Sequence, residues 1–214
     1  PVVVAYCDTG GEHLDNVRFL KDCENWLGHP IQILKSKKYE SIWSVFEKTR
    51  YLAGVKGARC TTEMKKLVRR EFEDLDTDTQ IFGFDIAERE RARKFVENNP
   101  EVRVRFPLID QGLSKQDCLD TLIKNGIDLP AMYKLGYRNN NCIGCVKGQS
   151  GYWNKIRRDF PDVFDRMAKL ERDIGAALCK SYAGDGKRKR VFLDELDPKA
   201  GRYDSELEIK CGLL

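Results

Sequence analysis

The hydrophobic pattern of the first 130 residues predicts strands and helices that alternate along the chain. Short apolar or alternating runs indicate strands over residues 2–7, 31–34, 80–84 and 102–106. Apolar residues recur at helical spacing over residues 17–27, 39–52, 61–72, 87–97 and 114–124. Such alternation is typical of a mostly parallel sheet with helices on both faces. We therefore predict an α/β fold of Rossmann-like layering.

The pattern changes after Pro130. A polar, cysteine-bearing loop is followed by two closely spaced amphipathic helices, near residues 152–160 and 162–178. From Lys180 onward Gly, Lys, Arg and Asp dominate, which is typical of an extended or mobile segment. Three regions are therefore expected. They are an α/β core over 1–130, a cysteine loop and helical subdomain packed on it over 131–178, and a mobile tail over 179–214.

Composition narrows the class of protein. The chain has 214 residues, of which 41% are hydrophobic and 34% charged, as in a globular domain with a real core. No apolar run approaches the roughly 20 residues of a membrane span, and no secretory signal is visible, so we expect a cytoplasmic protein without a membrane partner. The chain opens inside a strand without a starting Met, and we expect residues to precede Pro1. A net charge of +4 permits a phosphate-rich ligand or nucleic acid but requires neither.

Cysteine placement is the strongest chemical signal. Cys142 and Cys145 form a C-x-x-C pair in a tight polar loop, and Cys60 lies far upstream. A thioredoxin-type motif would follow the first strand, whereas this pair comes late in the chain. Structural zinc requires four protein ligands, and both histidines lie in the first helical unit. The soft-ligand set therefore favours an iron–sulfur cluster held by these three cysteines and one more.

The sequence leaves two interpretations open for each of two cysteines. Cys60 opens a helix that carries Lys65 and further basic residues, a setting that predicts a lowered thiol pKa; the alternative is a buried, inert thiol. Cys211 is the best candidate for the fourth ligand or for a nucleophile on the tail; the alternative is a surface thiol.

Polar residues follow two of the predicted strands. Asp8, Thr9 and Gly10 come directly after the first strand, where open α/β sheets bind ligands, although an ordinary turn explains them equally well. Gly83 ends the third strand, and Arg91 on the next helix could meet phosphate or sulfate oxygens; a solvated helix face is the simpler interpretation. The basic run at 187–190 is interpreted as a solvated loop rather than a nucleic-acid contact.

Taken in order, these motifs resemble those of the phosphoadenosine phosphosulfate reductase family, of the PP-loop superfamily. The resemblance spans residues 2–171 and includes the C-x-x-C pair that follows Gly136 and Tyr137. It implies an adenine-nucleotide α-hydrolase-like fold and a [4Fe-4S] cluster on Cys60, Cys142 and Cys145. It also implies an adenine nucleotide, ATP or adenosine phosphosulfate, bound by Asp8, Thr9, Gly10, Lys65, Gly83, Glu88 and Arg91.

The resemblance implies an enzyme. In the reductases a cysteine near the C-terminus, here Cys211, attacks the activated sulfate, and a thioredoxin-like reductant releases sulfite. The alternatives are an ATP-dependent iron–sulfur sulfurtransferase that takes sulfur from a donor and modifies tRNA or DNA, and a non-catalytic nucleotide- or metal-binding module. Three departures keep these open. The family's phosphate loop would precede Val2, Thr61 stands where cluster-bearing reductases have a second cysteine, and Lys210 and Leu214 replace their Glu and His.

Overall fold

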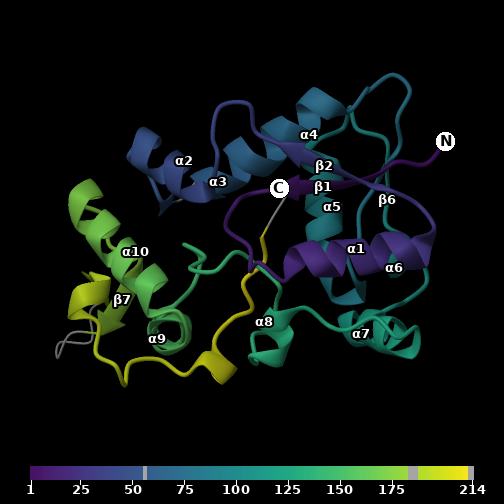
Figure 1. The fold of residues 1–214 in the computed structure, drawn as a ribbon. Coiled ribbons are helices and arrows are strands. Elements are labelled where there is room, and N and C mark those ends of the chain that lie inside the picture. Colours follow the sequence, from purple (N-terminus) through teal and green to yellow (C-terminus); the bar gives the residue numbers. More distant parts are fainter. Residues whose placement is uncertain (55–56, 183–187, 212–214) are drawn as a thin grey trace.

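The protein has an α/β fold, as the sequence predicts. The computed structural model describes residues 1–54, 57–182 and 188–211 (Figure 1). The first two predicted strands are β1 (Val4–Asp8) and β2 (Ile31–Lys35), and they pair in parallel. The other two are β5 (Gln80–Ile81) and β6 (Val104–Arg105), also parallel. Two antiparallel pairs were not predicted: β3 (Ala53–Gly54) with β4 (Gly57–Ala58), and β7 (Cys179–Tyr182) with β8 (Arg188–Val191).

The expected continuous sheet is not formed by the described residues. Their strands make four separate two-stranded ladders, so β1 and β2 are not joined to β5 and β6. The reason lies partly in strand length, since β5 and β6 have two residues each and offer little edge for further pairing. The described residues therefore do not show one continuous parallel sheet, whereas the β1–β2 and β5–β6 pairs have the parallel sense that the fold prediction requires.

The helices follow the predicted order. In the first half they are α1 (Asn16–Leu27), α2 (Ile42–Thr49), α3 (Arg59–Thr61), α4 (Leu67–Phe72), α5 (Arg89–Asn98), α6 (Pro107–Asp110) and α7 (Lys115–Lys124). After them come α8 (Ala131–Lys134), α9 (Ser150–Asp159) and α10 (Pro161–Ile174). The single helix predicted over 61–72 is interrupted by a π-helical turn, η1 (Thr62–Lys66), between α3 and α4. Within the described ranges, no helix has the length and apolar character to cross a membrane.

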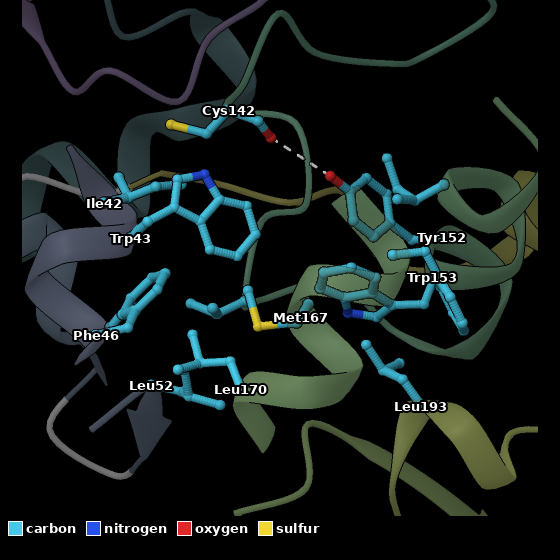
Figure 2. Close-up of a cluster of buried hydrophobic side chains, with 14 of the residues drawn as sticks. Ile42, Trp43, Phe46, Leu52, Cys142, Tyr152, Trp153, Met167, Leu170 and Leu193 are labelled. Atoms are coloured by element: carbon cyan, nitrogen blue, oxygen red, sulfur yellow. Dashed lines mark hydrogen bonds between the residues drawn. The ribbon is translucent and has the colours of Figure 1, made fainter. Parts of the chain in front are cut away.

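The largest hydrophobic core is built from both halves of the chain. Figure 2 shows Phe46 of α2 facing Met167 of α10, with Trp153 of α9 and Leu193 of the tail on the same cluster. All four side chains are fully buried. Burying a side chain of this size contributes about 2–3 kcal/mol, so this cluster is a main source of stability. The core therefore contains residues from both sides of position 130.

A smaller core lies under α5. Phe84, Phe95 and Val102 are buried there, and the rings of Phe82 and Phe106 pack against them. Aromatic pairs of this geometry contribute beyond their buried area. This cluster fixes the end of β5, from which the chain runs into the 3₁₀ turn η2 (Ile86–Glu88) and α5.

The described part of the segment 179–214, expected to be a mobile tail, packs along the helical subdomain. It contains β7, β8 and the 3₁₀ turns η3 (Leu193–Glu195) and η4 (Tyr203–Ser205). Glu206 accepts hydrogen bonds from Gly151 N (2.5 Å) and Tyr152 N (2.9 Å), which caps α9. The yellow chain then runs toward the middle of the molecule (Figure 1). Of the basic run, residues 188–190 lie in β8, not in a loop, and residue 187 lies outside the described residues.

Candidate functional site

The turn after β1 is bonded directly to the C-x-x-C loop. Thr9 is buried, and its Oγ1 lies 3.0 Å from Cys142 Sγ, 133 positions away in sequence. Gly11 O accepts a hydrogen bond from Ile143 N at 2.8 Å. Gly10 has φ +59°, and an added Cβ would lie 2.8 Å from Glu40 O, so this position requires glycine. The end of β1 and the cysteine loop therefore form one unit.

Tyr152 of α9 is buried in the core and forms two hydrogen bonds with the C-x-x-C loop. Its hydroxyl accepts a hydrogen bond from Cys145 N (2.9 Å) and donates to Cys142 O (3.4 Å; Figure 2). Both cysteine peptide groups are thus held by one buried side chain on a helix. A loop fixed in this way keeps its thiols in place before any ligand binds.

Gly144 makes the loop sensitive to substitution. It has φ +75°, and an added Cβ would lie 2.7 Å from Val163 Cγ1 and 3.3 Å from Trp153 Cη2. We expect Gly144→Ala to lower the free energy of unfolding by about 2–4 kcal/mol, since backbone strain and overpacking add. Chemical denaturation measures the loss. The matched control is Gly126→Ala, at φ +71° with no neighbour within 4 Å, for which only strain of about 1–2 kcal/mol is expected. Equal losses in the two variants would contradict this account.

The structure gathers four thiols from distant parts of the chain. Cys145 and Cys211 lie close enough to Cys60 for their charges to raise the pKa of its thiol. In the same way, Cys211 raises the pKa of Cys145, and Cys145 raises the pKa of Cys142. The three predicted cluster ligands are therefore neighbours, and Cys211 joins them. Among the described residues, no three Cys, His, Asp or Glu side chains are already placed around one metal position.

Burial determines the protonation of these thiols. It raises the pKa of Cys60 to about 12 and that of Cys145 to about 11, and it raises the pKa of Cys142 as well. The lowered pKa predicted for Cys60 is wrong, because α3 is only three residues long and desolvation outweighs the nearby ammonium groups of Lys65 and Lys147. At neutral pH all three are uncharged thiols. A thiol that coordinates a metal loses its proton, so this donor set fits a soft, positively charged metal centre.

Lys65 is a buried cation of the site. It lies in the π-helical turn η1, near enough to Cys211 for that thiol to raise the pKa of its ammonium. Burial alone would lower its pKa, but charges at Cys211, Cys142 and Glu12 raise the pKa above the usual lysine value. Glu12 Oε1 lies 3.6 Å from Cys142 Sγ. π-helical turns are frequent at functional sites, and this one aims a charged side chain at the thiols.

Both halves of the molecule hold the tail that carries Cys211. The side-chain amides of Asn139 and Asn141 donate to Ile209 O, at 3.1 and 2.9 Å. Lys147 Nζ donates to Lys210 O at 3.1 Å. From the other side, Arg91 Nη2 donates to Cys211 O at 2.8 Å. The thiol is therefore placed by four side chains that hold the carbonyl groups of its own peptide segment.

The remaining residues predicted to bind the nucleotide lie in different surroundings. Arg91 lies 4.2 Å from the Phe84 ring centroid and pairs with Glu88, so both belong to the surroundings of the tail. Asp8 accepts a hydrogen bond from Gly10 N and pairs with Lys35 at 3.1 Å, so its carboxylate serves the turn. Gly83 is exposed, and within the described ranges an added Cβ would meet Leu108 Cδ1 at 3.8 Å and none of the thiols.

Sequence reasoning missed five residues of the site. They are Glu12, Asn139, Asn141, Lys147 and Tyr152. The run of three asparagines signals a polar loop, but nothing in it indicates a partner in the tail. The other residues have no local signal, because each acts on an atom that only the tertiary fold brings near.

Comparison of the chain with protein-family models, with curated proteins and with solved structures finds no match.

Proposed function

We propose that this protein is an enzyme of the phosphoadenosine phosphosulfate reductase type, which reduces a nucleotide-activated sulfate with Cys211 as nucleophile. The observation that carries the proposal is the position of Cys211. Its thiol lies against the Lys65 ammonium and beside Cys60 and Cys145. A cysteine sulfur beside a lysine ammonium is placed to attack a sulfate whose oxygens that ammonium binds.

Reduction of the activated sulfate by Cys211 needs one further reactant, a dithiol reductant, for its atoms and electrons to balance. Cys211 Sγ attacks the sulfate sulfur, a sulfur–sulfur bond forms, and the bond to the phosphate oxygen breaks, so that the nucleotide leaves with that electron pair. A thiol of a thioredoxin-like protein then attacks Cys211 Sγ and releases sulfite. Its second thiol closes a disulfide and returns Cys211 as a thiol. The dithiol thus supplies the two electrons that convert sulfate to sulfite.

Cations of the site suit such a substrate. Lys65 beside Cys211 Sγ and Arg91 at Cys211 O would face the sulfate and phosphate oxygens of an adenine nucleotide. The turn from Asp8 to Gly10 would hold the nucleotide at the end of β1, with Gly83 and Glu88 at the end of β5, in the Rossmann-like arrangement of this superfamily.

Cys60, Cys142 and Cys145 would hold a [4Fe-4S] cluster. The support is the donor chemistry, since three buried thiols from two segments meet beside a fourth. When bound, the cluster would supply a redox-active centre next to the substrate. All eight cysteines are free thiols, which supports a reducing, cytoplasmic location.

A second candidate is an iron–sulfur sulfurtransferase acting on tRNA or DNA, with ATP and a sulfur donor. Thr61 next to Cys60 favours it, because a cluster with three cysteines would leave one iron free to carry sulfur. Such an enzyme does not reduce sulfate, so it would not need Cys211 as a nucleophile toward sulfate sulfur. The two proposals therefore differ in the role of this single residue.

Iron analysis tests the cluster. We expect anaerobically purified protein to contain iron and acid-labile sulfide, and we expect Cys60→Ala, Cys142→Ala and Cys145→Ala each to lower the iron content at least about tenfold. Cys118→Ala on α7 is the control, because no contact places it at the site, and it should keep its iron. Iron that survives in all three variants would contradict the assignment.

A further inference from the structure

An open pocket lies on the side of α3 that carries Arg59, next to Cys60. Its volume is about 640 Å³. It lies between the residues that precede α2, the end of α2 and the start of α3, and it is lined by Lys38, Tyr39, Lys48, Thr49, Tyr51 and Arg59, among others. Small-molecule sites commonly occupy about 300–1,000 Å³, so a nucleotide would fit. None of the residues assigned to the cysteine site lines this pocket.

Positive charge is concentrated in the pocket. The ammonium groups of Lys38 and Lys48 lie over the same Tyr39 ring, at 5.1 and 5.9 Å from its centroid. Within the described ranges neither forms an ion pair, whereas the neighbouring Lys35 and Lys37 pair with carboxylates. Two like charges held over one ring repel each other, and an anion bound between them would relieve that repulsion.

Arg59 adds a third cation that is already oriented. Its Nη2 pairs with the buried Glu63 at 2.6 Å, which restrains the guanidinium at the pocket wall. Glu63 itself does not line the pocket, and the named lining residues include no carboxylate. An arginine that pairs with one acid still has donors for a second oxyanion in its plane.

Aromatic surface completes the pocket. Both Tyr39 and Tyr51 line it; Tyr39 is buried, whereas Tyr51 is 39% exposed. Unpaired bases stack on exposed aromatic side chains, and phosphates bind to the cations beside them. Cations with adjacent tyrosines are therefore the combination that recognises a nucleotide.

We propose that this pocket binds the phosphate and base of a nucleotide, either free or within a single-stranded polynucleotide. The proposal is independent of the reductase function, because it uses none of the thiols.

The test uses the complete chain and a fluorescently labelled, short single-stranded oligonucleotide. We expect the double variant Lys38→Gln, Lys48→Gln to bind about tenfold more weakly, since it removes two charge-assisted hydrogen bonds. The dependence of log K on log salt should become shallower by about 0.7 for each phosphate that the variant no longer neutralises. The control double variant, Lys124→Gln, Lys169→Gln, has the same net charge and replaces exposed lysines on α7 and α10. We expect it to bind within about twofold of the wild type.

Competition by a nucleoside monophosphate identifies the source of the ligand. If the monophosphate displaces the oligonucleotide, the pocket binds free nucleotides; if only unlabelled oligonucleotide does, it binds a polynucleotide. The proposal is overturned if the pocket variant binds like the wild type, or if the control loses as much affinity. Both double variants change exposed side chains and should keep the wild-type melting temperature and iron content. A failure of the pocket is thereby separated from a failure of the proposed reductase.

Discussion

Cys211→Ser should lower sulfite formation from the nucleotide-activated sulfate by at least about a thousandfold while leaving the iron content unchanged. The large effect is expected because the residue would make and break the bonds to sulfur, and loss of a nucleophile is among the costliest changes in an enzyme. The tail should still dock, since Asn139, Asn141 and Arg91 bond to its carbonyl groups and not to the thiol. Steady-state sulfite assays with a dithiol reductant measure the change.

Two outcomes of that experiment would contradict the expectation, each in a different way. Unchanged sulfite formation would eliminate the reductase proposal. Loss of iron together with activity would make Cys211 a cluster ligand, which contradicts its role as nucleophile. The control is Cys118→Ser, a half-buried thiol on α7 that does not touch the site and should retain full activity.

Trp153→Ala should lower the free energy of unfolding by about 3–5 kcal/mol, the range for removing a large buried aromatic side chain. Trp153 is fully buried on α9, and its ring packs edge-on against Tyr152 and Phe164, at centroid distances of 5.7 and 6.4 Å. It also lies under Gly144, so the cavity would open directly beneath the cysteine loop. Urea denaturation with linear extrapolation measures the loss.

Trp153→Phe is the matched variant, and it should cost clearly less. The indole Nε1 is buried without a hydrogen-bond partner in the described part of the chain, so its removal leaves no new unsatisfied group. The phenyl ring keeps most of the packing against Tyr152. A Phe variant as unstable as the Ala variant would contradict this account, because the indole N–H would then contribute a bond of its own.

The local pattern of the sequence predicted the elements well. Runs such as that of β1 and the amphipathic spacing of α10 depend only on neighbours in sequence, and the Ser114–Asp117 capping box of α7 formed as expected. These features required no knowledge of the tertiary fold. The role of Cys60 and the C-x-x-C pair as cluster ligands stays a prediction.

What the sequence could not predict depends on long-range packing. The thiol of Cys60 has basic neighbours in sequence, yet burial is the largest influence on its pKa, and the thiols of Cys145 and Cys211, distant in sequence, raise that pKa further. The tail looks extended and polar, but Glu206 supplies the cap that α9 lacks from its own N-terminal residues. Likewise, Lys38 and Lys48 lie over the same Tyr39 ring only because the folding of α2 brings Lys48 back to it.

The capping of α9 by Glu206 has a consequence for when the cysteine site closes during synthesis of the chain. Ribosomes synthesise residues 206–211 well after Cys60, Cys142 and Cys145, so these thiols exist in the nascent chain before the segment that covers them. Domains form progressively from the N-terminal side during synthesis. We expect the thiols to stay accessible until that segment has emerged, and to be closed over only when Glu206 reaches Gly151 and Tyr152.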